Sequence, residues 1–140
     1  MTDQWDAALR SLLDDVCRHP NTGDFAATWG TVEDSRYSPG GWTVVCPPDS
    51  PIASLDIQRW DVDGIGIVEV TWKAERQPSW SALRERFGPF EELDEVPGRS
   101  PRYAVDWPMP FDQPADAVLL VTVDDDGAIE GVTVRRDPRR

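Results

Sequence analysis

The chain has 140 residues and a formal net charge of −12, with 26 acidic and 14 basic side chains. This length predicts one domain whose core is large enough to be stable without a disulfide or a structural metal. The negative charge repels phosphate backbones and anionic lipid surfaces, so nucleic acids and membranes are not expected as partners.

The N-terminal segment has neither the cationic start nor the apolar run of a signal peptide. No window of the chain approaches the roughly 20 apolar residues of a membrane span. We therefore expect a cytoplasmic protein in which Cys17 and Cys46 are reduced thiols, because that compartment keeps thiols reduced.

Residues 4–18 carry apolar side chains at three- and four-residue steps, which predicts an amphipathic helix. Its other side is predicted to face solvent and carries Asp6, Arg10, Asp14 and Arg18. A short helix is predicted to end at Gly30. The alternating segment 42–47 predicts a strand, and 54–72 predicts a β-hairpin that turns at Gly64.

A second set of elements follows a linker at 73–79. Residues 81–88 predict a short helix that ends at a glycine, and residues 103–108 predict a strand. Residues 117–134 predict a hairpin around Asp126-Gly127, because Asp-Gly supplies the positive φ that a tight hairpin turn needs.

The two sets match in order and spacing. Phe25 and Trp29 lie 58 positions before Leu83 and Phe87, and this separation grows to 64 at the final strands. Separations that grow in small steps across loops are typical of a diverged duplication. We predict an N-terminal helix over 1–21, repeat one over 22–77 and repeat two over 78–140. The two repeats are predicted to form one α+β domain with about six antiparallel strands and helices packed on one face.

This arrangement resembles the tandem repeat of the β-lactamase inhibitory protein and the related small outer-membrane assembly lipoproteins. The residues that carry the resemblance are Phe25, Trp29, Gly30, Trp42, Asp63 and Gly64 in one copy and Leu83, Phe87, Gly88, Pro89, Tyr103, Asp126 and Gly127 in the other. The resemblance implies a non-enzymatic binding protein that uses a concave sheet. Unlike the inhibitor, this chain has no secretion signal and no cysteine pair in each repeat.

Catalytic and metal-binding patterns are weak. His19 is the only histidine, and no partner that would orient it for catalysis is identifiable. The aspartates near Gly64 and Gly127 lack the ligand spacing of an EF-hand, so turn formation is the favoured interpretation. We expect no catalytic residue, no metal and no cofactor. One acidic run comprises Glu91, Glu92, Asp94 and Glu95. It is interpreted either as a recognition patch for a basic partner or as a solvated segment.

Seven tryptophans are many for this length, and the repeat helps to sort them. Trp72 falls where the second copy has Arg136, and a position that accepts arginine is expected to be exposed. Trp and Arg are enriched at binding hot spots, so we predict a binding surface at Trp72 and Arg136, widened by Trp60. The alternative is that the 73–79 linker folds back and covers Trp72.

These observations lead to a non-catalytic protein-binding module of inhibitor or immunity-protein character as the first hypothesis. Its partner is expected to be another protein, possibly a basic one. The second hypothesis is a small-ligand-binding domain with an aromatic pocket between sheet and helices. The third is an enzyme that uses carboxylates alone.

Overall fold

The computed structural model describes residues 4–18, 22–34, 42–59, 65–110 and 112–138. Within these ranges the helices are α1 (Gln4–Arg18), α2 (Thr22–Trp29) and α3 (Trp80–Phe87). The strands are β1 (Thr31–Asp34), β2 (Trp42–Val45), β3 (Ile52–Arg59), β4 (Ile65–Trp72), β5 (Glu91–Glu92), β6 (Arg102–Trp107), β7 (Ala115–Val123) and β8 (Ile129–Pro138). None of these helices is long and apolar enough to cross a membrane.

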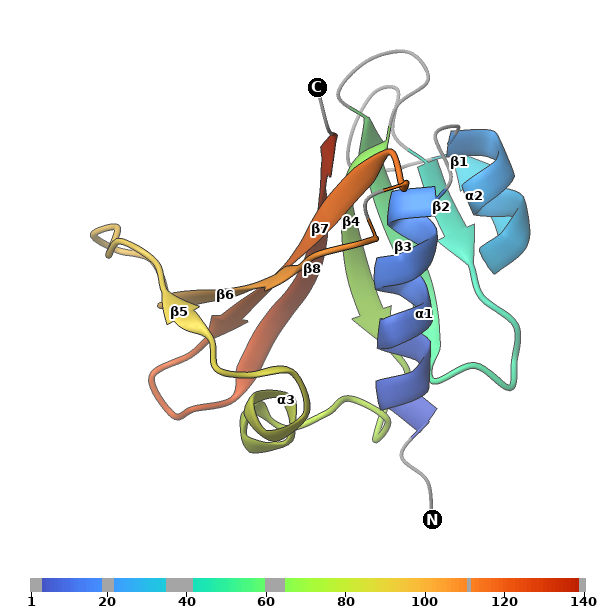
Figure 1. The fold of residues 1–140 in the computed structure, drawn as a ribbon. Helices are drawn as coiled ribbons and strands as arrows, with labels where there is room; N and C mark the ends of the chain where they lie inside the picture. Colours follow the sequence, from blue (N-terminus) through green and yellow to red (C-terminus); the bar gives the residue numbers. More distant parts are fainter. Residues whose placement is uncertain (1–3, 19–21, 35–41, 60–64, 111, 139–140) are drawn as a thin grey trace.

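The strands form one antiparallel sheet in the order β1-β2-β3-β4-β8-β7-β6-β5 (Figure 1). The α+β class and the antiparallel sheet are thus confirmed. The expected number of about six strands is wrong, because the part of the chain that the structure describes contributes eight. The two that were missed, β1 and β5, lie at the edges and are short and polar, so neither carries a run of alternating apolar residues.

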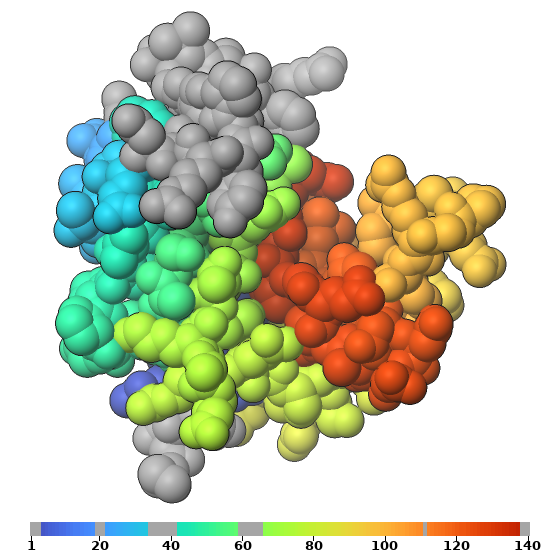
Figure 2. Space-filling model, turned by 180° about the vertical axis from the view of Figure 1, so that it is seen from behind, coloured from blue at the N-terminus to red at the C-terminus, as the bar shows by residue number. Residues whose placement is uncertain are grey.

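The register of the strands places alternate side chains on two faces. The face toward α1 is buried in its middle, and one row across it contains Val44, Leu55, Val70, Val132 and Val121. The other face, called the open face below, is centred on a row that crosses all eight strands and contains Glu33, Thr43, Asp56, Glu69, Thr133, Leu120, Ala104 and Glu91. Figure 2 looks at the molecule from behind, where β3, β4 and β8 form the surface and α1 is almost wholly hidden.

The polar side of α1 holds the helix in place. The indole nitrogen of Trp107 donates to Asp14 at 3.0 Å, and that of Trp29 donates to Asp15 at 3.0 Å. Asp6 accepts from Arg86 of α3 at 3.1 Å. The prediction that this side faces solvent is therefore wrong for Asp6 and Asp14. It is confirmed for Arg18, which is exposed, and Arg10 keeps 43% of its side chain exposed while its guanidinium lies 4.7 Å from the centre of the Phe87 ring.

Most locally predicted elements are present with bounds close to those expected. Gly127 has a φ of 84°, which is the conformation that the Asp-Gly turn requires. The side chain of Asp124 accepts from two backbone N–H groups of the same turn, at 2.9 and 2.8 Å. His19 and the turn expected at Gly64 lie outside the described residues.

Candidate functional site

The candidate site lies where β4 and β8 separate, near the middle of the sheet. The last registered pair between these strands is Val70 with Val132. Beyond it β4 continues to Trp72, and β8 has already begun at Ile129. The strands separate at this point, and each face of the sheet has a pocket there. The two pockets share five lining residues, which are Val70, Thr71, Glu130, Gly131 and Val132.

The pocket on the open face has a volume of about 390 Å³ and is called the Gly131 pocket. A Cβ built on Gly131 would have no heavy atom within 4 Å, so the missing side chain leaves open space here. The other polar walls come from Glu69, Thr71, Thr122, Glu130 and Thr133. Carboxylates only accept hydrogen bonds when ionised, and hydroxyls both donate and accept. The Gly131 pocket therefore suits a cationic group with several N–H donors.

Glu69, which lines this pocket, has Asp56 as its neighbour on the open face. They are directly opposite in the pairing of β3 with β4. Asp56 Oδ1 accepts a hydrogen bond of 2.7 Å from the hydroxyl of Thr43, and Glu69 is exposed. Like charges at opposed positions destabilise a sheet. A cationic group bound between them would remove that penalty.

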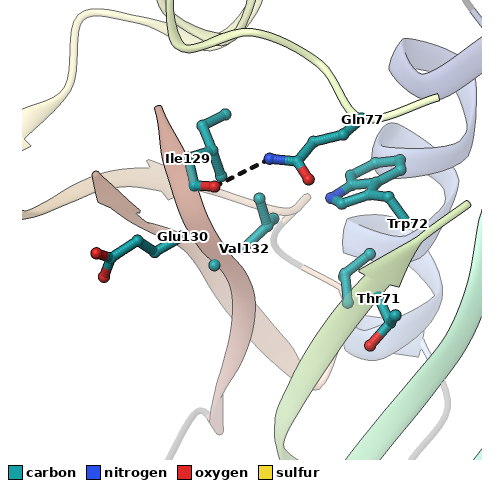
Figure 3. A pocket seen from close by; sticks show the side chains of 8 residues that line it. Thr71, Trp72, Gln77, Ile129, Glu130 and Val132 are labelled. Carbon is teal, nitrogen blue, oxygen red and sulfur yellow. Dashed lines mark hydrogen bonds between the residues drawn. The ribbon is translucent and has the colours of Figure 1, made fainter. Parts of the chain in front are cut away.

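The pocket on the side of α1 has a volume of about 210 Å³ and is called the Trp72 pocket. The residues that line this pocket but not the other are Trp72, Gln77 and Ile129. The side-chain amide of Gln77 crosses from the β4–α3 connection and donates to the backbone oxygen of Ile129 at 3.0 Å. Figure 3 shows this bond, with the indole nitrogen of Trp72 pointing into the space between the two strands.

The indole N–H of Trp72 has an unusual environment. Its nitrogen is buried, and no acceptor among the described residues is placed to take its proton. Leaving a buried donor unpaired costs about 1–3 kcal/mol. A buried donor of this kind calls for an explanation, and it points into a pocket large enough for an acceptor to enter.

The structure changes the expectation for Trp72. Its side chain is half-buried and packs against the hydrophobic core, so it is not the exposed residue of the first interpretation. The linker alternative is closer to what is observed. Lys73 donates from its backbone to Pro51 at 3.0 Å, and Gln77 reaches across to β8. The connection after β4 thus folds back over the end of the sheet.

The expectation that Arg136 is exposed is wrong. Arg136 is only 7% exposed, and its Nε donates to the backbone oxygen of Val16 at 3.0 Å. Val16 lies in the last turn of α1, where the carbonyls have no partner within the helix. The guanidinium therefore joins β8 to the C-terminal end of α1. Trp60, the third residue of the expected surface, lies outside the described residues.

Gly131 and Gln77 were not predicted as site residues. An isolated glycine inside a strand pattern signals a bulge or a close approach, so Gly131 carried a readable signal. Gln77 carried none, because its role depends on the position of Ile129, which is 52 residues away along the chain.

Both cysteines are free and buried. Burial raises the pKa of the Cys46 thiol, and the nearby charge of Lys73 opposes part of that change. Among the described residues, no group of three or more His, Cys, Asp or Glu side chains is placed to hold a metal ion.

Comparisons with known proteins add little to this picture. No family model matches the chain, and no curated protein sequence matches it. A solved structure of a DUF4309 family protein, YjgB from Bacillus subtilis, is similar with a TM-score of 0.47 and 14% identity over 84% of this chain and 78% of that one.

Proposed function

We propose that this chain is a non-catalytic protein-binding module, of inhibitor or immunity-protein character, that binds a basic protein on the open face of its sheet. The observation that carries the proposal is the opposition of Asp56 and Glu69 beside the Gly131 pocket, on a face that α1 does not cover. The overall charge of −12 adds a long-range attraction for a basic partner.

The Gly131 pocket is the proposed anchor point for that partner. Binding energy at protein interfaces concentrates in a few side chains that fill pockets, and arginine is one of the commonest. A guanidinium that enters beside Gly131 would meet the carboxylates of Glu69 and Glu130. The hydroxyls of Thr71 and Thr122 line the same space and can accept its remaining N–H groups.

The proposed tandem repeat is supported by the strand register. Leu55 pairs with Val70, and the residues 64 positions later, Leu119 and Val134, pair with one another. The register shift between β3 and β4 after Gln58 recurs between β7 and β8, again 64 positions later. Glu69 is also paired with the residue 64 positions later, Thr133. A twofold axis through this pair would exchange the halves.

The repeat matters for function because it doubles the width of the open face. It also agrees with what the resemblance to the β-lactamase inhibitory protein implies, which is binding through the sheet rather than catalysis. An experimental structure tests the repeat through superposition of 22–73 on 81–137. The superposition is expected to bring Gly30 onto Gly88 and Gly64 onto Gly127. Halves with different strand orders would contradict the duplication.

A small-ligand-binding domain remains the second candidate function. One specific observation favours it, namely the unpaired indole N–H of Trp72 in the Trp72 pocket, which is lined by β4, β8 and the β4–α3 connection. The cytoplasmic location and the lack of a cofactor stay part of the proposal.

The test uses the tagged 140-residue chain as bait in an extract of its native cells, followed by binding measurements with the isolated partner. The double variant Asp56→Asn/Glu69→Gln removes the opposed charges and keeps the acceptor for Thr43. The matched control, Asp94→Asn/Glu95→Gln, removes two charges from the exposed β5–β6 connection. We expect the first variant to weaken binding at least ~10-fold, about 1.4 kcal/mol, and the control to retain it.

Gly131→Val provides a second, uncharged probe of the same surface. It places in the Gly131 pocket a side chain that suits a strand and whose first carbon meets no neighbour. We expect an unchanged melting temperature and a similar loss of partner affinity. A partner that binds both open-face variants as tightly as the unmodified chain would overturn the proposal, and selective loss in the control would place binding on the acidic run instead.

A further inference from the structure

We propose that the Trp72 pocket is a binding site for a small neutral amide, whose carbonyl oxygen accepts the indole N–H of Trp72. The site lies on the α1 side of the sheet, across the strands from the Gly131 pocket. It does not depend on a protein partner at the open face, and either proposal can fail without the other.

The hydrogen-bonding groups of the pocket define the polar end of the ligand. The indole of Trp72 can only donate, and its N–H is buried without an acceptor among the described residues. Gln77 donates from its Nε2 to the backbone of Ile129, which leaves the Oε1 atom of the same amide as an acceptor. The pocket therefore offers one donor, on the half-buried indole of Trp72, and one acceptor, on the exposed side chain of Gln77. A carboxamide offers the complementary pair.

Charge and size exclude other ligand classes. Glu130 lines the pocket and the chain carries a net charge of −12, so an anionic ligand would be repelled. A cation brings only donors and would leave the indole N–H unpaired. The volume of about 210 Å³ lies below the roughly 300–1,000 Å³ typical of pockets for drug-sized molecules, so the ligand is a small one.

Apolar side chains form the other walls of the pocket. Ile129 and Val132 on β8 and Val70 on β4 contribute them, and Ile129 also packs against the core. A short aliphatic or cyclic body next to the amide would bury its apolar surface there. A lactam combines this body with a carbonyl and an N–H on the same side, so δ-valerolactam is the probe that the geometry suggests.

The experiment follows the indole N–H signals of the full chain by nitrogen–proton correlation NMR. The seven tryptophans give up to seven such signals, and the one lost in Trp72→Phe is assigned to Trp72. We expect δ-valerolactam to move this signal downfield in a saturable way, with a dissociation constant on the order of 1 mM. The other indole signals are expected to stay in place.

Two comparisons identify the groups responsible. Cyclohexanone has the carbonyl without the N–H, so we expect it to bind several-fold more weakly than the lactam. In Gln77→Ala we expect the lactam to bind no more tightly than cyclohexanone, while the affinity for cyclohexanone stays as it is in the unmodified chain. Trp72→Phe keeps an aromatic ring in the pocket and loses the donor. We expect this variant to bind the lactam at least ~10-fold more weakly. Its binding is followed through the backbone signals of Gly131 and Val132, because the indole signal is absent.

Two results would overturn the inference. One is a Trp72 signal that does not saturate and drifts with all the other indole signals, which would reflect a solvent effect of the probe. The other is lactam binding that is unchanged in Trp72→Phe, which would place the probe elsewhere on the protein. A melting curve for each variant verifies that the compared proteins are folded.

Discussion

Asp56 on β3 and Glu69 on β4 face one another directly across the strand pair, with both carboxylates on the open face of the sheet. Opposed like charges reduce sheet stability by a few tenths to about 1 kcal/mol. We expect Glu69→Gln to raise the free energy of unfolding by about 0.2–1 kcal/mol, measured by urea denaturation at low ionic strength. Added salt screens the repulsion, so the gain is expected to shrink as salt rises.

The same substitution is expected to weaken partner binding, so stability and binding should change in opposite directions. Glu95→Gln, in the exposed β5–β6 connection, is the control and is expected to change neither. A loss of stability in Glu69→Gln would mean that Glu69 makes a favourable contact that outweighs its repulsion with Asp56.

Arg136 connects the end of β8 to the last turn of α1 through its hydrogen bond with Val16. Arg136→Met keeps much of the packing volume and removes the charged donor. We expect this variant to lose about 1.5–3 kcal/mol of stability, the range for hydrogen bonds to charged groups. Chemical denaturation followed by circular dichroism provides the measurement.

The neighbouring arginine offers a matched control. Arg135 pairs with Asp137 at 2.9 Å, and these two side chains are 41% and 46% exposed. Exposed ion pairs of this kind contribute about 0–1 kcal/mol, so Arg135→Met is expected to change stability very little. Equal effects of the two substitutions would remove the structural role assigned to Arg136.

Trp72 contributes to stability through its ring and opposes it through its N–H. Its ring packs on the core, so we expect Trp72→Ala to lose about 2–4 kcal/mol, somewhat less than the truncation of a fully buried aromatic. Trp72→Phe removes the unpaired donor together with part of the ring. We expect it to cost less than about 1 kcal/mol, because the two changes offset each other.

Urea denaturation of both Trp72 variants separates the two contributions. If Trp72→Phe is as destabilising as Trp72→Ala, the indole N–H has a partner in solution, such as a bound water. A Trp72→Ala variant as stable as the unmodified chain would restore the exposed position that the sequence suggested.

Cys46 is expected to react slowly with alkylating reagents while the protein is folded. Burial raises its pKa above the ordinary value of 9.0, so less of the reactive thiolate is present at about pH 8. We expect both cysteines to be alkylated in concentrated guanidinium and neither to be lost to a disulfide, as measured by mass spectrometry. Rapid modification of Cys46 in the folded state would contradict its burial.

The raised pKa also gives Cys46 a pH-dependent effect on stability. The folded state favours the protonated thiol, so its contribution is complete below the ordinary pKa of 9.0. It is lost as pH rises through the higher folded-state value. We expect Cys46→Ala to show a shallower decline of unfolding free energy above about pH 9 than the unmodified chain. Equal slopes for the two proteins would mean that this thiol does not titrate differently on folding.

Local chemistry was sufficient to predict several elements from the sequence alone. The Asp126-Gly127 turn follows from the backbone freedom of glycine, and helix α1 follows from apolar residues at helical spacing. The ends of α2 and α3, at Trp29 and Phe87, were readable because each precedes a glycine. These features depend on neighbours a few residues away, which a sequence displays directly.

Features that depend on distant neighbours were decided only by the tertiary structure. The edge strands β1 and β5 exist because β2 and β6 offer them free backbone groups, and their own residues carry no strand pattern. Arg136 looked exposed because arginine usually is, but an unpaired carbonyl of α1, 120 residues away, made its burial favourable. The Trp72 pocket likewise arises from the separation of β4 and β8. No local pattern encodes this separation, because the distance between two strands depends on the side chains and segments that pack around both of them.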